Sequence, residues 1–392
     1  MEWLAFLLPL AALSGWLSAR RYYKNNPKYS SHQLNPEYFK GLNFLLNEQP
    51  DKAIDVFINL LEVNSETVET HLALANLFRK RGEADRAIRI HQNLIARPSL
   101  TRSQRDQALI ELGFDYMHAG VLDRAEQIFL ELINKPSAPI PALEQLLRIY
   151  QQEKEWEQAI EMAKQILPQQ ENKLGAMIAQ FYCELIEQQL DTVKSSPSPL
   201  IKLAHKYDKN CVRASLLEAR NHIHNSRFQK ALKCLHRIER QNPLYIAEAL
   251  ELLQNCYQQL NNLADFENWL HTILERHPNM TRARLMLTGI IQQKKGRQAA
   301  QNYLHHQLQS HPSVEGLHTL VSLGDHSNPT LIPLIKDITH NLVTSSIQYS
   351  CNNCGFSGMS MHWQCPSCKQ WSTIRPIEHD LSTLNSLSEK TV

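Results

Sequence analysis

The sequence predicts an all-α protein in which pairs of helices stack into a superhelical solenoid. Three observations predict this fold class. Glycine is scarce, with 12 among 392 residues, which disfavours the turns and phosphate loops of an α/β enzyme. Hydrophobic residues make up 43% of the chain and charged residues 20%, so most of it should fold. A pattern of small and bulky residues also recurs about every 34 positions.

Small residues mark the second helix of each repeat and set its period. Ala53, Ala87, Ala125 and Ala159 follow one another at steps of 34, 38 and 34 residues. Phe57 and Phe129 stand four positions after two of them and are expected in the core. The series continues at steps of 34 residues with Ala231, Asp265, Ala299 and Pro333.

In several repeats the first helix carries its own small residue, twelve positions before the second; Leu147, Leu253 and Leu287 depart from this pattern. This slot holds Gly41, Ala75, Gly113 and Ala219. An aromatic residue follows three positions later at Phe44, Phe78, Tyr116 and Tyr150. Gly82 and Gly120 stand between the two halves, where a tight turn needs a residue that tolerates positive φ. Together these positions are typical of the tetratricopeptide repeat.

The repeat array is expected over residues 35–340, in eight to nine units, with one degenerate unit near 174–208. Pro197 and Pro199 interrupt residues 192–200, because proline breaks a helix interior. The pattern leaves open whether this segment is a hinge or a long loop. A solenoid of this kind presents a concave face that binds protein segments, which predicts protein partners.

The N-terminal segment from Trp3 to Ala19 has no charged side chain, and Arg20 and Arg21 follow directly. This pattern predicts a transmembrane anchor at residues 1–20 and a juxtamembrane linker at 21–34. By the positive-inside rule, the chain would be single-pass in a bacterial cell inner membrane, with its bulk on the cytoplasmic side. A cleaved signal peptide and a buried first helix are the alternatives.

Four of the eight cysteines stand close together, as Cys351, Cys354, Cys365 and Cys368. Two C-x2-C pairs supply four thiolates, which predicts a closed tetrahedral site for one metal ion, zinc or iron. Disulfides and redox chemistry of a single C-x-x-C pair are the alternatives. A closed shell leaves no open coordination position, so this metal is not expected to be catalytic.

The metal-binding module is expected over residues 345–378, followed by a flexible tail at 379–392. Its C-x-x-C-G and C-P-x-C runs resemble the two knuckles of rubredoxin, although the gap between them is short and Lys369 replaces a glycine. Aromatic residues surround the cysteines, and they either shield the metal or dock the module on the array. They are Tyr349, Phe356, Trp363 and Trp371. His362 is not needed as a ligand, since four cysteines complete the shell.

The other cysteines and the histidines have no predicted chemistry. The isolated cysteines are expected as helix-packing residues in a reducing compartment. They are Cys183, Cys211, Cys234 and Cys256. Histidines such as His222 and His224 lie on expected helices without an acidic partner at catalytic spacing.

Composition and motifs narrow the class of function. The formal net charge is +2, which argues against nucleic-acid binding by charge, and only Lys369 and Arg375 lie on the metal module. No phosphate-binding glycine loop, nucleophile elbow or HExxH motif is present in the sequence, so no enzyme is predicted. An adaptor that gathers proteins is favoured, and a rubredoxin-like electron-transfer protein is the alternative.

Three segments together resemble the lipopolysaccharide assembly protein B family of Gram-negative bacteria. They are LLPLAALSGW with RRYYK, YFKGLNFLLNEQPDKAIDVF, and CNNCGF with HWQCPSCKQWSTIRPI. The resemblance implies a regulator of lipopolysaccharide synthesis that promotes degradation of the lipid A-committing deacetylase by the membrane-anchored ATP-dependent protease. It also implies that other lipopolysaccharide-synthesis or transport proteins are partners, and that iron is the metal bound by the four cysteines. A homodimer remains open.

Overall fold

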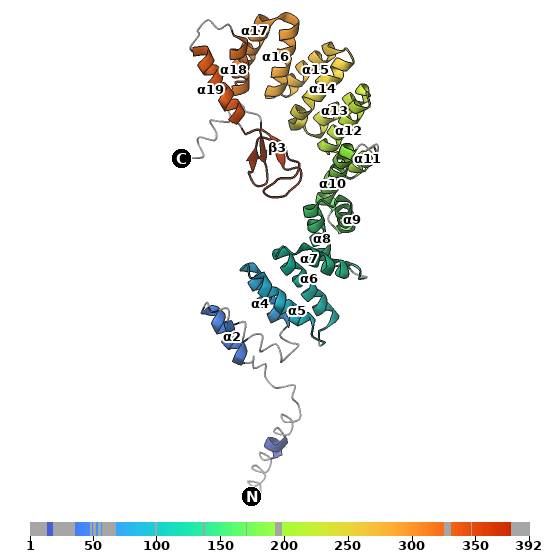
Figure 1. The fold of residues 1–392 in the computed structure, drawn as a ribbon, viewed down its shortest axis with the longest axis vertical. Coiled ribbons are helices and arrows are strands. Elements are labelled where there is room, and N and C mark those ends of the chain that lie inside the picture. Colours follow the sequence, from blue (N-terminus) through green and yellow to red (C-terminus); the bar gives the residue numbers. More distant parts are fainter. Residues whose placement is uncertain are drawn as a thin grey trace, which may run out of the picture. The chain divides into compact units, whose positions relative to one another are not determined.

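The computed structural model describes a helical chain that ends in a small sheet (Figure 1). The described residues are 14–18, 36–47, 49, 52–53, 56, 68–98, 100–135, 138–169, 171–192, 198–324, 331–345 and 347–377. The chain divides into two compact units, Met1–Ala142 and Leu143–Val392.

The first unit consists of helices that pack as consecutive pairs. They are α2 (Pro36–Leu46), α4 (Val68–Lys80), α5 (Ala84–Ile95), α6 (Arg102–His118) and α7 (Leu122–Ile133), followed by the start of α8 (Ile140–Glu153). Helix α4 packs on α5, and α6 packs on α7. The expected core residues Ala87, Ala125 and Phe129 are fully buried.

In the pair formed by α6 and α7, the small residue in the first helix allows the second helix to come close. A Cβ atom placed on Gly113 of α6 would lie 2.5 Å from ring atoms of Phe129 in α7. No side chain fits at that distance, so a larger residue would force the two helices apart. This contact confirms the expected role of the small slot in the repeat.

The second unit continues the series of helix pairs. Its helices are α9 (Trp156–Ile166), α10 (Glu171–Thr192), α11 (Ser198–Tyr207), α12 (Val212–His224), α13 (Phe228–Gln241), α14 (Ile246–Gln259), α15 (Leu263–Arg276), α16 (Thr281–Lys295), α17 (Arg297–Ser310), α18 (Val314–Leu323) and α19 (Leu331–Ser345). Two short 3-10 helices, η4 (Leu167–Gln169) and η5 (Pro243–Tyr245), connect them. A buried apolar cluster extends from Val212 in α12 to Leu323 in α18.

The turns inside the pairs use left-handed residues, as the sequence predicts for Gly82 (φ 85°) and Gly120 (φ 74°). In the second unit, three turns of the same kind use residues other than glycine. They are Lys154 (φ 61°), Ser226 (φ 57°) and Asn261 (φ 53°). Each of these costs of order 1 kcal/mol relative to glycine, which the packed helices on either side offset.

The repeat register shifts by one residue late in the array. Asp265 is exposed and Ala299 is only half-buried, whereas the next residues, Phe266 and Ala300, are fully buried. The predicted slots at Asp265 and Ala299 are therefore wrong by one position. The turn at Asn261 and the continuing helix α15 place Phe266 against the first helix of the pair.

The C-terminal module is a three-stranded antiparallel sheet, called the ribbon below. Its strands are β1 (Tyr349–Cys351), β2 (Ser357–Gly358) and β3 (Ile374–Pro376), in the order β2-β1-β3. Tyr349 pairs with Gly358 on one side and with Pro376 on the other. The sheet brings both cysteine pairs to one place in the ribbon.

The predicted membrane location is corrected by the structure. A membrane-spanning helix needs about 20 consecutive apolar residues. Across the described ranges, no helix combines that length with that hydropathy; the 22-residue α10 contains Glu184 and Glu187. The prediction of a single pass through a cell inner membrane is therefore wrong on this finding. Of the predicted anchor at 1–20, only residues 14–18 are described, as exposed helix.

Several other expectations lie outside the described residues. They concern the linker at 21–34 and the flexible tail at 379–392. Whether residues 192–200 form a hinge or a long loop depends on residues 193–197, which also lie outside the described residues. On either side of them, α10 packs against α11, so the degenerate unit near 174–208 is a helix pair.

Candidate metal centre

The four cysteines predicted as ligands lie together in the ribbon. Their Sγ atoms are all within 4.8 Å of one another. Cys351 and Cys368 are 3.8 Å apart, and Cys354 and Cys365 are 3.6 Å apart. A tetrahedral metal ion with metal–sulfur bonds of ~2.3 Å places its ligands roughly 3.8 Å apart. The donor set and its geometry therefore fit one zinc or iron ion.

The first cysteine pair forms a knuckle turn that directs backbone amides at sulfur. The N–H of Cys351 donates to the carbonyl of Phe356 (2.7 Å), and that of Gly355 donates to the carbonyl of Cys351 (2.9 Å). Gly355 adopts φ 74°, in the left-handed region. In this turn, the backbone N–H groups of Asn353 and Cys354 donate to Cys351 Sγ. These bonds stabilise a thiolate at Cys351.

The second cysteine pair repeats this turn. The N–H of Cys365 donates to the carbonyl of Gln370, and that of Lys369 donates to the carbonyl of Cys365, both at 2.9 Å. Lys369 adopts φ 58°, at the position equivalent to Gly355. The departure from the rubredoxin pattern therefore leaves the backbone geometry intact, at a cost of about 1 kcal/mol.

The ligands differ in how readily they ionise. The hydroxyl of Thr373, 3.3 Å from Cys351 Sγ, holds the pKa of that thiol down to about 6. The backbone N–H of Gln370 lowers the pKa of Cys368. Burial raises the pKa of Cys365 to about 11, and this side chain has no exposed surface. A bound cation would supply the positive charge that the buried thiolate of Cys365 needs.

Two aromatic side chains of the ribbon dock on the repeat helices. The indole of Trp371 meets Trp156 and Phe181 edge-to-face, at centroid distances of 6.0 and 5.7 Å. Trp363 stacks on Tyr245 at 5.6 Å, and the guanidinium of Arg213 lies 5.9 Å from its ring. Such pairs contribute about 0.5–1.5 kcal/mol each beyond their buried area.

Hydrogen bonds join the ribbon to helices from α8 to α16. Ribbon residues and array residues pair as Trp371 with Gln151 (3.1 Å), Ser372 with Gln180 (2.9 Å), Ile374 with Tyr245 (2.7 Å), Tyr349 with Glu248 (2.7 Å) and Gln348 with Arg282 (2.9 Å). Phe356 instead packs within the ribbon, against the core of Tyr349 and Ile374. Of the aromatic residues near the cysteines, Trp363 and Trp371 therefore dock the ribbon on the array, whereas Phe356 packs inside the ribbon.

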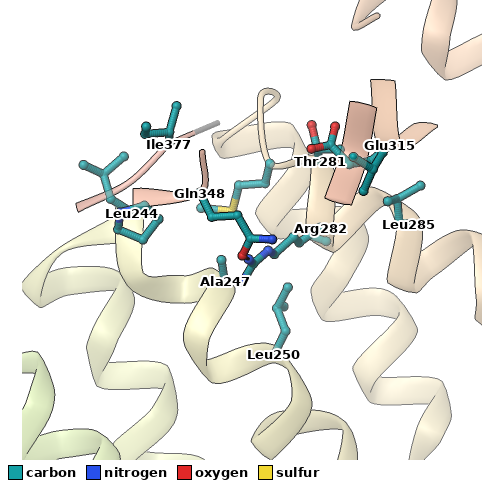
Figure 2. A pocket seen from close by; sticks show the side chains of 13 residues that line it. Leu244, Ala247, Leu250, Thr281, Arg282, Leu285, Glu315, Gln348 and Ile377 are labelled. Atoms are coloured by element: carbon teal, nitrogen blue, oxygen red, sulfur yellow. Dashed lines mark hydrogen bonds between the residues drawn. The ribbon is translucent and has the colours of Figure 1, made fainter. Parts of the chain in front are cut away.

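A cavity of about 250 Å³ lies where the ribbon meets α14 and α16 (Figure 2). Leu250 and Leu285 form apolar walls, and Arg282 lies beside Gln348 of the ribbon in the same view. Ile377, at the end of the ribbon, also lines it. A partner segment that entered this cavity would contact the array and the ribbon together.

Sequence reasoning singled out the four cysteines that the structure brings together, but it missed the residues that receive the ribbon. Gln151, Gln180 and Tyr245 occupy positions that carry no repeat signature. Their partners are 129 to 220 residues away in the sequence. His362 is exposed and bonds to Ser360 (3.0 Å), in agreement with its exclusion as a ligand.

Comparison with known proteins decides the family. A family model described as a rubredoxin metal binding domain matches residues 349–376, and one described as a tetratricopeptide repeat matches 70–105. Lipopolysaccharide assembly protein B of Escherichia coli strain K12 is 40% identical over 386 residues, covering 96% of this chain and 98% of that protein. The chain belongs to the lipopolysaccharide assembly protein B family. The member from Haemophilus influenzae is 37% identical over 396 residues, covering 97% and 99%.

Solved structures with similar folds are more distant from this member of the lipopolysaccharide assembly protein B family. A tetratricopeptide repeat protein from Parabacteroides merdae matches with a TM-score of 0.32 and 13% identity, covering 71% of this chain and all of that one. The family membership rests on the sequence relatives and on the two family models.

Proposed function

We propose that this chain acts in lipopolysaccharide assembly as an adaptor without catalytic activity of its own. Family membership supports the process, since the relatives carry the name lipopolysaccharide assembly protein B. The observation that carries the adaptor role is the docked ribbon, which holds four cysteine thiols able to fill the shell of one metal ion and is bonded to a repeat array. A filled shell has no open position for a substrate or a water nucleophile.

The proposed adaptor promotes degradation of the deacetylase that commits precursor to lipid A. In this proposal the array binds the deacetylase and presents it to the ATP-dependent protease. Binding both proteins at once raises their effective concentration for each other, so degradation accelerates without any new chemistry. The resemblance of the sequence to the family supports these two partners, and other lipopolysaccharide-synthesis proteins extend the set.

The metal has a structural task in this proposal. A ribbon of about thirty residues is too small to fold on its own core, so the metal contributes folding free energy. The folded ribbon then fixes the surface around the cavity formed with α14 and α16. Iron is favoured by the family resemblance, and zinc satisfies the same donor set.

Crosslinking in living cells, followed by mass spectrometry of the captured proteins, tests the adaptor role. Recovery of the protease and the deacetylase is expected. Recovery of a reductase alone, with a red and redox-active protein, would instead establish the electron-transfer alternative. The half-life of the deacetylase gives the second readout and should lengthen severalfold in Cys365→Ser. His362→Ala, in the same ribbon but outside the shell, is the matched control and should leave the half-life unchanged.

A further inference from the structure

A second group of metal-ligating side chains lies outside the ribbon, between α12 and α13. Glu218 and His222 are four residues apart on α12, so they share one helix face. Cys234 on α13 meets them, and one potential ligand atom from each residue lies within 4.8 Å of the others. These three residues are called the α12–α13 cluster below.

The cluster replaces apolar residues that other repeats carry at the same positions. Glu218 precedes the small slot, where other repeats have Leu74, Leu112 and Leu146. His222 stands at the aromatic position, which elsewhere holds Phe78, Tyr116 and Tyr150. Cys234 follows the second small residue by three, where other repeats have Ile90, Ile128 and Met162. All three departures fall in one repeat, and all three introduce metal-ligating groups.

The protein alone satisfies the cluster only in part. Cys234 is 6% exposed, and its thiol hydrogen-bonds to Glu218. Among the described residues, Nδ1 of His222 is buried without a hydrogen-bond partner. Leaving a buried polar atom unpaired costs about 1–3 kcal/mol, which the apolar residues of the other repeats avoid. A bound cation would remove this cost.

Neighbouring side chains orient the cluster. Arg237 donates to Oε2 of Glu218 at 2.5 Å, and Nε2 of His205 lies 3.4 Å from the same oxygen. This arrangement fixes the carboxylate of Glu218 next to His222 and Cys234. Second-sphere contacts of this kind orient carboxylate ligands in metal sites.

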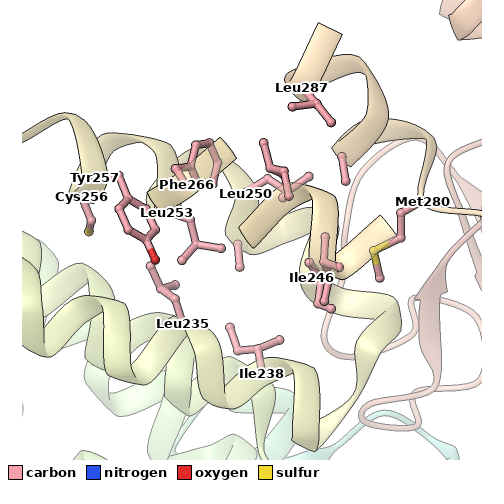
Figure 3. Close-up of a cluster of buried hydrophobic side chains, with 14 of the residues drawn as sticks. Leu235, Ile238, Ile246, Leu250, Leu253, Cys256, Tyr257, Phe266, Met280 and Leu287 are labelled. Atoms are coloured by element: carbon pink, nitrogen blue, oxygen red, sulfur yellow. The ribbon is translucent and has the colours of Figure 1, made fainter. Parts of the chain in front are cut away.

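Cys234 and Cys256 both belong to the buried apolar cluster of the second unit, but their polar surroundings differ. Cys256 lies with Leu253 and Tyr257 on α14, and Leu235 and Phe266 extend the same apolar core (Figure 3). A thiol in such surroundings acts as a small hydrophobic group. The thiol of Cys234 packs in this core too, and in addition it lies beside the carboxylate of Glu218 and the imidazole of His222.

We propose that Glu218, His222 and Cys234 bind one divalent transition-metal ion of the zinc class. Zinc accepts sulfur, nitrogen and oxygen donors together, and three protein ligands with one water complete its usual four positions. This site is separate from the four-thiolate site of the ribbon, so the full chain binds two metal ions.

The test counts zinc in the full-length protein. Metal-free protein is reconstituted with Zn²⁺, exchanged against a chelator of micromolar affinity, and measured by native mass spectrometry. Two zinc ions are expected for the unaltered chain. One is expected for His222→Tyr and for Cys234→Ile, which restore residue types that other repeats carry and so should preserve the fold.

Matched controls use neighbours outside the cluster. His224→Phe, exposed on the same helix, and Cys256→Val, in the apolar core, should retain two zinc ions. With Co²⁺ as a second probe, the sulfur-to-cobalt absorption should lose the contribution of one thiolate in Cys234→Ile. A single zinc ion in the unaltered chain, or two zinc ions in both cluster variants, would overturn the proposal.

Discussion

The hydroxyl of Tyr245 donates a 2.7 Å hydrogen bond to the carbonyl oxygen of Ile374, 129 residues later in the chain. Tyr245 ends η5 between two repeat helices, and Ile374 begins β3 of the ribbon. Both side chains are buried, at 4% and 1% exposure. The ring of Tyr245 also stacks on Trp363, so this one residue holds the ribbon by two kinds of contact.

Tyr245→Phe should loosen the ribbon without releasing its metal. The variant keeps the ring but leaves the buried carbonyl of Ile374 unpaired, which should cost about 1–3 kcal/mol. Hydrogen exchange should accelerate for β3 amides by roughly 10-fold or more. Tyr303→Phe on α17, outside the ribbon interface, is the control. Unchanged exchange in Tyr245→Phe would show that stacking alone holds the ribbon.

Trp371→Ala should undock the ribbon more strongly than Tyr245→Phe. It removes both edge-to-face contacts and the bond to Gln151. Because Trp371 is half-buried, its truncation should cost less than the roughly 3–5 kcal/mol of a fully buried aromatic. Limited proteolysis should then cleave near the ribbon while a colorimetric thiol assay still reports the four cysteines of the ribbon as protected. The exposed Met359→Ala in the same ribbon provides the comparison. Equal protease resistance in the two variants would contradict this assignment.

Metal removal should destabilise the second unit and leave the first unchanged. The ribbon contacts helices from α8 to α16, so its unfolding exposes their docking residues, whereas the contacts of a repeat array are otherwise local. Chelation or Cys365→Ser should shift tryptophan emission to the red as Trp363 and Trp371 meet water. Hydrogen exchange should rise in the second unit and stay constant in α4–α7. A uniform rise through both units would refute this division.

Lys369→Gly should stabilise the metal-loaded ribbon by about 1 kcal/mol, because it relieves a lysine at φ 58°. Gly355→Ala should destabilise it by a similar amount, since Gly355 adopts φ 74°. Chelator competition for the bound metal measures both changes as opposite shifts in apparent affinity. Lys336→Gly, on an exposed face of α19, should lower helix stability without changing metal affinity.

Acidification should weaken the first unit through His71, which lies buried in α4. Burial, reinforced by the charge of Arg97, lowers the pKa of His71 to about 4, whereas the unfolded chain has the ordinary value near 6.5. The unfolded state therefore binds the proton more readily. Stability is complete above pH 6.5 and falls by about 1–3 kcal/mol as the pH drops toward 4. Hydrogen exchange of α4 at pH 7 and pH 5, corrected for intrinsic rates, measures this loss.

His71→Leu should flatten that pH dependence. His118→Leu, on the exposed end of α6, should leave it unchanged. Should His71→Leu retain the full slope between pH 7 and pH 5, another group of the first unit would carry the effect.

The parts of the fold that sequence predicted depend on local chemistry. Gly82 and Gly120 predict their turns because glycine adopts positive φ at low cost. Lys154 and Ser226 make the same turn without any such signal, since tertiary packing overrides their preference. Tertiary packing also explains why Phe266, rather than Asp265, is the buried residue of its repeat. The sequence contains no glycine that would reveal the length of the preceding turn.

The clustering of the four cysteines was predictable because they stand within eighteen residues and their spacing is typical of a tetrahedral metal site. The docking surface of the ribbon was not, because Gln180 and Tyr245 meet the ribbon only through the curvature of the assembled array. The α12–α13 cluster could be predicted only in part from the sequence. His222 departs visibly from the aromatic pattern, but only the structure brings Cys234 to it.

The bonds from the ribbon to Gln151 and Arg282 have a consequence for biosynthesis. During translation, helices α8 to α16 leave the ribosome well before residues 347–377. They therefore lack their contacts with the ribbon until that segment has been made. Repeat pairs can form as they emerge, but the second unit is complete only when the ribbon has captured its metal ion. Assembly of the ribbon, and of the four-cysteine site that it carries, is therefore expected to follow synthesis of the helices that receive it.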